Sequence, residues 1–162
     1  MRRKILMAVD DSIHSHHSMR YAIQILSESQ DVTFTLFHVQ PIISQYLLDE
    51  ARTDSKANAT LKKIIKKTTV EAQMLLEKQK ERMITMGIAD ERIEMLTQPR
   101  MLGLARDILE YARKGIYDAI VVGRRGLSRI QKTFMGSTSA NLLEGAEATP
   151  VWMVDGNVTS QR

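Results

Sequence analysis

The stretch VVGRRGLSRIQKTFMGSTSA, residues 121–140, joins an apolar run to a polar, cationic segment. Its glycines stand at positions 123, 126 and 136. A backbone without Cβ atoms can pass close to another group at such positions. Its cationic side chains, uninterrupted by any acidic residue, are Arg124, Arg125, Arg129 and Lys132. This combination indicates a loop that follows a buried strand and binds an anion, for which a phosphate is the first candidate.

The length and composition of the chain indicate what kind of protein carries this loop. The chain has 162 residues, of which 43% are hydrophobic and 26% charged, so we expect a single domain over residues 1–162 with a proper core. It has no cysteine, which excludes disulfides and thiolate chemistry. The first apolar run ends at Asp10 and no run of about 18 apolar residues occurs, so we expect no signal peptide, no membrane span and a cytoplasmic location.

Apolar runs and helical patterns alternate along the chain. Five short runs predict strands, at 4–10, 32–39, 92–98, 118–123 and 149–155. Between them, apolar residues at helical spacing predict helices at 17–29, from residue 58 to a stop at Gly87, at 101–115 and at 137–146. Strands alternating with helices imply parallel crossovers, and therefore an open parallel sheet with helices on both faces.

The segment before the long helix is the least regular, and we expect residues 41–57 to form a mobile loop. The helix itself should bury one face, made of Leu61, Ile65, Thr68, Ala72, Leu75, Leu76, Gln79 and Met83. Four lysines, Lys62, Lys63, Lys66 and Lys67, largely face away from that stripe. We interpret them as a solvated helix face, although the net charge of +4 also permits a polyanionic partner.

Two loops are expected to meet at one crevice. The first strand ends at Asp10–Asp11–Ser12 and the fourth ends at Gly123, and ligands of open parallel sheets bind where the strand order reverses. The glycine spacing matches neither a P-loop nor a dinucleotide fingerprint. Instead, Gly123-x-x-Gly126, nine residues and then Gly136-Ser137 resembles the nucleotide loop of the universal stress protein family. The segments ILMAVDDS and ATPVWMVD resemble the family's opening and closing strands.

The resemblance implies a flavodoxin-like, Rossmann-like sheet of order 3-2-1-4-5 that, in one branch of the family, binds ATP. Carried over residue by residue, it places Ala8 and Asp10 against the adenine and Val39 against the base. The residues around ribose and phosphates would be Gly123, Arg125, Gly126, Gly136, Ser137, Thr138 and Ser139, with Arg124 and Arg129 adding positive charge. The chain departs from the family pattern at Asp11, where glycine is frequent, and at Gln98–Pro99, where a glycine commonly stands two places before the proline.

Binding rather than turnover is the expected activity. No acidic residue lies between Gly123 and Ala140 to hold a metal or act as a base. We therefore expect slow or no ATP hydrolysis, at most a weak ATPase or autophosphorylation, with any Mg²⁺ held by the phosphates rather than by protein ligands. Helix N–H groups at Gly136-Ser137 and the three hydroxyls that follow are suited to phosphate oxygens.

Other readings of the sequence are weaker. The cluster His14, His16 and His17 invites a metal, but no carboxylate or fourth histidine has the matching spacing, so a solvated helical turn is the favoured interpretation. Basic residues are not interleaved with aromatics, so nucleic-acid binding is not expected. A serine hydrolase elbow is absent from the sequence.

The closing strand should lie at a sheet edge, where unpaired backbone invites a partner. In the family this strand commonly pairs with its copy in a second subunit, which implies a homodimer through residues 150–154 with Trp152 and Met153 near the junction. The sequence therefore indicates a stress-response protein that acts as a nucleotide-responsive regulatory dimer. The alternative is an interaction module of the same fold that binds no nucleotide and acts only through its dimer or partner surface.

Overall fold

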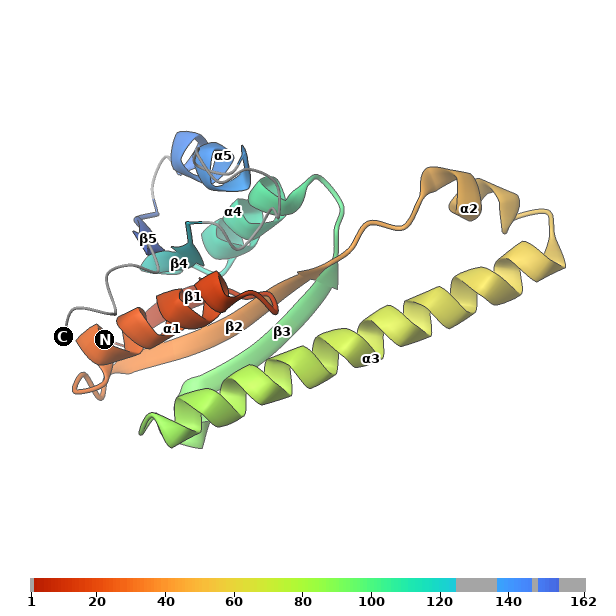
Figure 1. Cartoon of the computed structure of the whole chain (residues 1–162). Coiled ribbons are helices and arrows are strands. Elements are labelled where there is room, and N and C mark those ends of the chain that lie inside the picture. The colour runs from red at the N-terminus through yellow and green to blue at the C-terminus, as the bar shows by residue number, and fades with distance from the viewer. Residues whose placement is uncertain (1, 125–136, 147–148, 155–162) are drawn as a thin grey trace.

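The computed structural model of the chain describes residues 2–124, 137–146 and 149–154, without the side chains of Ser137 and Ser139. Five strands and five helices alternate within these ranges (Figure 1). In chain order they are β1 (Arg3–Ala8), α1 (Ile13–Leu26), β2 (Val32–Gln40), α2 (Gln45–Glu50), α3 (Ser55–Thr85), β3 (Ile93–Pro99), α4 (Leu104–Lys114), β4 (Ala119–Gly123), α5 (Ser137–Gly145) and β5 (Val151–Val154). A single 3₁₀ turn, Asp90–Arg92, precedes β3.

All five strands belong to one parallel sheet of order β3-β2-β1-β4-β5, which confirms the strand order expected from the sequence. β1 lies between β2 and β4, with Ile5 opposite both Phe34 and Ala119. The chain moves outward in one direction from β1 to β3 and then crosses back to β4. The sheet order therefore reverses between β1 and β4, where the loops after both strands leave the same edge.

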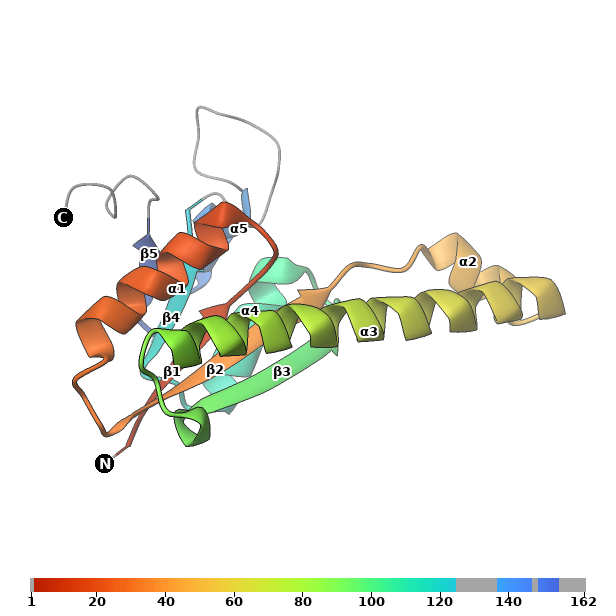
Figure 2. The same cartoon turned by 60° about the horizontal axis from the view of Figure 1, so that its bottom comes forward.

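Helices cover both faces of the sheet because the strand side chains alternate between two apolar cores. On one face, α1 and α3 pack on Ile5, Met7 and Leu36. On the other face, α4 and α5 pack on Leu6, Phe37 and Ile120. The long helix α3 runs along the first of these faces beside β2 and β3 (Figure 2).

Only the C-terminal half of α3 rests on the sheet. The helix has 31 residues and is therefore about 46 Å long, whereas β2, with nine residues, spans about 30 Å. Its outer half projects past the strands together with α2 (Figure 1). The expected buried face is consequently wrong at its N-terminal end: Leu76 is 1% exposed, but Ile65 is 45% exposed.

Residues 41–57 are more regular than the sequence indicated. They contain α2 and the first turn of α3, so the expectation of an irregular loop is wrong for about half of this segment. Capping explains both helices: Ser44 Oγ accepts a hydrogen bond from Leu47 N at 3.3 Å, and Asp54 Oδ2 accepts one from Ala57 N at 2.9 Å. These side chains satisfy backbone N–H groups that would otherwise lack partners.

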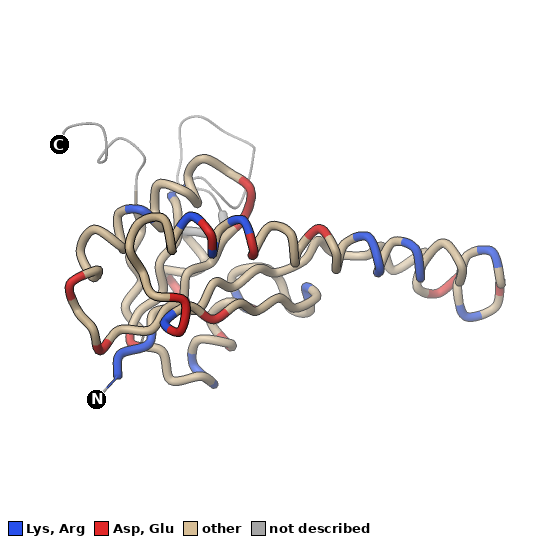
Figure 3. Tube along the Cα trace, turned by 90° about the horizontal axis from the view of Figure 1, so that it is seen from below, with Lys and Arg blue, Asp and Glu red and all other residues tan. Residues whose placement is uncertain are grey.

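The four lysines of the outer half of α3 are all exposed, as the solvated-face interpretation predicts. Figure 3 shows this basic stretch on the projecting half of the helix, with mixed charges at its tip. Lys67 Nζ lies 3.7 Å from Glu71 Oε1 in an exposed pair, which contributes little to stability. No helix in the described ranges combines the length and the apolarity that a bilayer crossing requires.

The two halves of α3 should respond differently to truncation of an apolar side chain. Leu76→Ala should lower the free energy of unfolding by about 2–5 kcal/mol, because it leaves a cavity in the core. Ile65→Ala, on the same helical stripe, should cost less than about 1 kcal/mol because its side chain is largely solvated. Urea unfolding of both variants provides the measurement. Equal losses would mean that the outer half of α3 is covered in solution.

Candidate functional site

The turn between β1 and α1 is held by hydrogen bonds from two serines. Ser12 caps α1, its Oγ accepting from Ser15 N at 3.1 Å, and Ser15 Oγ accepts from Asp10 N at 3.1 Å. The Asp10 carboxylate closes the turn, because its Oδ1 accepts from Ser12 N at 2.9 Å. The end of β1 is therefore fixed in position by its own side chains, and Asp10 Oδ2 has no hydrogen-bond partner among the described residues.

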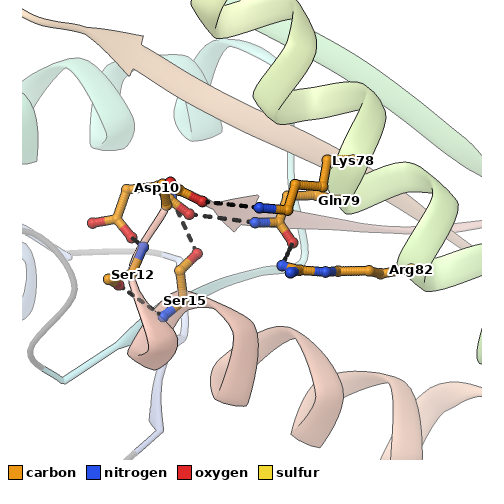
Figure 4. A network of polar contacts seen from close by, with 7 residues as sticks. Asp10, Ser12, Ser15, Lys78, Gln79 and Arg82 are labelled. Carbon is orange, nitrogen blue, oxygen red and sulfur yellow. Dashed lines mark hydrogen bonds and ion pairs between the residues drawn. The ribbon is translucent and has the colours of Figure 1, made fainter.

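The same turn is tied to the long helix. Gln79 of α3 is buried; its Nε2 donates to the Asp10 carbonyl oxygen at 3.4 Å and its Oε1 accepts from Arg82 at 3.2 Å (Figure 4). Lys78 Nζ lies 3.5 Å from Asp11 Oδ1. Gln79 therefore connects the loop after β1 to α3, an interaction that its place on an otherwise apolar stripe did not reveal.

A cleft of about 320 Å³ opens at the carboxyl ends of β1 and β2. Three residues predicted to contact the base, Ala8, Asp10 and Val39, all line it. Phe37 and Ile108 add apolar wall, and both are buried. The three contacts implied by the family resemblance therefore share one cleft, whose surface suits a flat, mostly apolar group. Its lining residues include none from β4, so the expected meeting of the loops after β1 and β4 stays a prediction.

Further lining residues were missed by the sequence analysis. They come from the end of β1, from β2 and the segment after it, and from the β3–α4 connection with the start of α4. They are Val9, His38, Pro41, Ile42, Arg100 and Leu104. His38 Nδ1 donates to the Val9 carbonyl oxygen at 2.9 Å, which closes the cleft between the two strand ends. A signal for Arg100 existed in the sequence, since a cation directly follows the proline that ends the third strand.

On the other side of β1, Gly123 ends β4 beneath the first turn of α1. A Cβ at this position would lie 2.7 Å from the His14 carbonyl oxygen and 2.8 Å from its carbon. The next residue, Arg124, donates its backbone N–H to the Val154 carbonyl oxygen at 2.9 Å. Gly123 is therefore required by the packing of α1 against β4, a reason independent of any ligand.

The structure describes only some of the other residues predicted to contact phosphate. Arg125, Gly126, Arg129 and Gly136 lie outside the described residues, as do the side chains of Ser137 and Ser139. Ser137 is the first residue of α5, and Thr138 in the same turn is half-buried. Since β4 and β5 are parallel, the chain between them must run back along the sheet, so α5 begins at the edge where the cleft lies.

The histidines of α1 do not form a metal centre in the described part of the chain, where no three His, Asp or Glu side chains are placed to hold an ion. The rings of His16 and His17 lie 6.3 Å apart. Burial, followed by the charges of Arg82, His17 and Arg20, lowers the pKa of His16 below its ordinary value. A proton on His16 is thus disfavoured by its surroundings.

A five-stranded parallel sheet of this order, with a cleft beside the reversal, belongs to the open α/β folds that bind ligands at the carboxyl ends of their strands. The model of the universal stress protein family matches residues 1–155. The chain belongs to the universal stress protein family.

Individual relatives agree with this assignment. Universal stress protein YxiE of Bacillus subtilis (strain 168) is 26% identical over 152 residues, which cover 86% of this chain and 90% of the relative. Universal stress protein UspA from Lactobacillus plantarum is similar in structure, with a TM-score of 0.72 at 18% identity over 95% of this chain and 99% of that one.

Several similar folds were solved with a nucleotide. A family protein from Arabidopsis thaliana with AMP bound has a TM-score of 0.60 at 20% identity and covers 94% of this chain and 91% of its own. A universal stress protein from Archaeoglobus fulgidus in complex with dAMP has a TM-score of 0.62 at 19% identity, and the match covers 94% of this chain and 97% of that one. At these identities the likeness shows a shared fold.

The packing role of Gly123 can be tested by stability alone. Gly123→Ala should lower the free energy of unfolding by about 1–3 kcal/mol, because the added methyl group meets backbone atoms that cannot move without shifting α1. Gly145→Ala is the matched control: its methyl group would lie 2.6 Å from Leu109 Cδ1, a side-chain end that can rotate away. Urea unfolding that gave Gly123→Ala the smaller loss would contradict this reading.

Proposed function

We propose that this chain binds an adenine nucleotide, with ATP as the first candidate, across the carboxyl ends of β2, β1 and β4. The observation that carries the proposal is the cleft at the ends of β1 and β2, which brings Ala8, Asp10 and Val39 together beside the sheet reversal. The glycine-rich segment begins directly after β4, the other neighbour of β1. A ligand with an apolar ring at one end and phosphates at the other fits this arrangement.

The cleft can make the contacts that the base of a nucleotide requires. Phe37, Val39 and Ala8 provide apolar surface for a purine. Asp10 Oδ2, which has no partner among the described residues, can accept a hydrogen bond from the exocyclic amine of adenine or from a ribose hydroxyl.

The proposal that phosphates bind after β4 is based on the sequence that follows Gly123. Backbone N–H groups at the start of α5, hydroxyls at 137–139 and the arginines at 124, 125 and 129 are suited to phosphate oxygens. Hydrogen bonds to charged groups contribute roughly 1.5–3 kcal/mol each. Three or four of them, together with a buried base, reach the roughly −8 kcal/mol of micromolar affinity.

Nucleotide complexes of similarly folded proteins support the same ligand class. The Arabidopsis protein has AMP bound and the Archaeoglobus protein has dAMP bound, and adenine is common to both. Their sequence identity to this chain is low, so the support concerns the fold's capacity to present such a cleft.

We further propose that hydrolysis is slow or absent and that the bound nucleotide serves as a signal in a stress response. Neither nearby carboxylate is assigned to the phosphates: Asp10 Oδ1 closes its own turn through Ser12 N while Oδ2 is proposed to meet the base or ribose, and Asp11 is paired with Lys78 at 3.5 Å. Phosphoryl transfer needs an oriented nucleophile and a metal held in place. Any Mg²⁺ would therefore be held chiefly by the phosphates.

The nucleotide proposal is tested by releasing and titrating the ligand. Heat-denatured protein should release adenine nucleotide, and calorimetry on stripped protein should give a dissociation constant near or below about 10 μM for ATP. Gly126→Val should weaken binding at least tenfold, because the proposal assigns this glycine to the phosphates, where a side chain would keep backbone N–H groups away from their oxygens. Gly145→Ala, outside the crevice, is the control. Wild-type protein that neither releases nor binds nucleotide at millimolar concentration would favour the alternative interaction module.

We also propose a homodimer formed through β5, residues 150–154. β5 stands at one edge of the sheet, beside β4, and Trp152 and Met153 are half-buried there. An edge strand of this kind can pair with its copy around a two-fold axis.

The dimer proposal predicts a mass near twice the 18.4 kDa of the chain in light scattering at micromolar concentration. Trp152→Glu should shift the protein to the monomer, since it brings a charge to the junction in both copies. Nucleotide binding by that variant should persist, because the cleft lies across the sheet at β1 and β2. A monomeric wild-type protein would refute the dimer and leave the nucleotide site unaffected.

A further inference from the structure

Arg100 stands in the wall of the cleft at a position that the rest of the fold holds firmly. It is the first residue after β3, and it lines the cleft together with Ala8, Asp10 and Val39. The connection that carries it is fastened by Asp107, which is 3% exposed. Asp107 Oδ2 accepts from Met101 N at 3.0 Å and its Oδ1 accepts from Leu102 N at 2.9 Å. The backbone next to Arg100 is therefore fixed.

The guanidinium of Arg100 is not used by the described structure. Its Nε is buried without a hydrogen-bond partner, and the described residues offer the side chain no ion pair. A buried donor without an acceptor costs free energy, and an arginine carries five N–H donors in all. The residue therefore has donors available for a group that enters the cleft.

Arg92, at the opposite end of β3, shows what a structural arginine looks like in the same protein. Its Nε donates to the Val32 carbonyl oxygen and its guanidinium also donates to the Ser29 carbonyl oxygen, both at 2.8 Å. It also lies over the Phe34 ring, 5.6 Å from the centroid. Arg92 thus holds a strand in place, whereas Arg100 lines a cleft and has no partner among the described residues.

The strand order decides which part of a nucleotide Arg100 can meet. β3 and β4 are three strands apart in the sheet, which is about 14 Å at the usual strand spacing. Phosphates held after β4 and a base held over β1 and β2 would place Arg100 beyond the base. Arg100 would thus lie nearer to the outer edge of the base than to the phosphates.

We propose that Arg100 recognises the purine ring by donating a hydrogen bond to a ring nitrogen at its outer edge. The inference rests on the proposed nucleotide site. Ring nitrogens of a purine accept hydrogen bonds, whereas the exocyclic amine of adenine donates, and arginine has only donors. Asp10 and Arg100 together would offer one acceptor and one cation to two different edges of the same ring.

The experiment combines a side-chain change with single-atom changes in the ligand. Wild-type protein, Arg100→Met and Arg100→Lys are titrated by calorimetry with ATP and with its 1-deaza, 3-deaza and 7-deaza analogues, each of which replaces one ring nitrogen by CH. Arg106→Met, an exposed arginine on α4, is the matched control. Urea unfolding of each variant verifies that the fold is kept.

Wild-type protein should bind one of the three analogues roughly tenfold more weakly than ATP, the loss expected for one hydrogen bond from a charged group. Arg100→Met should bind ATP roughly tenfold more weakly and should no longer distinguish that analogue from ATP. Arg100→Lys should recover part of the affinity, and Arg106→Met should behave as wild type.

Three results would overturn the role of Arg100 while leaving the nucleotide site in place. These are unchanged ATP affinity in Arg100→Met, no discrimination among the analogues by wild-type protein, and an equal loss for ATP and all analogues. Wild-type protein that binds none of the four ligands would overturn the nucleotide proposal itself. The two failures are therefore distinguishable.

Discussion

The pairing of β1 with both β2 and β4 is the constraint on which the rest of the structure depends. It buries β1 on both faces and at both edges, which its continuous apolar sequence from Ile5 to Val9 allows. It also sends the chain outward to β3 and then back across to β4. A crevice between two diverging loops is the geometric result of that reversal, and the turn at Asp10 lies beside it.

The turn at Asp10 is positioned by interactions that serve structure and site together. Ser12 Oγ satisfies a backbone N–H group in the first turn of α1, Ser15 Oγ satisfies that of Asp10, and Gln79 reaches the same turn from α3. Each of these contacts would be costly to lose, since a buried polar group without a partner destabilises the folded state. The cleft is consequently preorganised, and its one free carboxylate oxygen among the described residues belongs to a side chain whose position is fixed.

The polar residues in the cleft and in the structure that supports its loops divide into those with structural partners and those without. Asp107 and Gln79 are nearly inaccessible to solvent and hold backbone groups of the loops. Arg100 has no such partner in the described part of the chain. This difference, rather than the charge of the residue or its place in the sequence, separates a residue that supports the site from one whose donors are left for a ligand.

The sequence by itself determined the strand and helix alternation, the strand order through the family resemblance, and the convergence of Ala8, Asp10 and Val39. The alternation depends on local periodicity, which a linear pattern records directly, whereas the strand order and the three cleft residues were implied by the family resemblance. The same pattern assigned one continuous buried face to α3 and an irregular loop to residues 41–57, and both assignments were partly wrong. Periodicity shows which residues of a helix share a face, but it carries no information on how far the sheet extends beneath them.

Only the tertiary structure decided the roles of Gly123, Gln79 and Arg100. Gly123 lacks space for a Cβ because the backbone of α1 crosses it, and Gln79 meets the turn after β1 from 69 residues away. Arg100 acquires its position from the order in which β3 and β2 lie beside β1. Contacts between residues distant in sequence depend on how the elements pack in three dimensions, and no local pattern of residues encodes that packing.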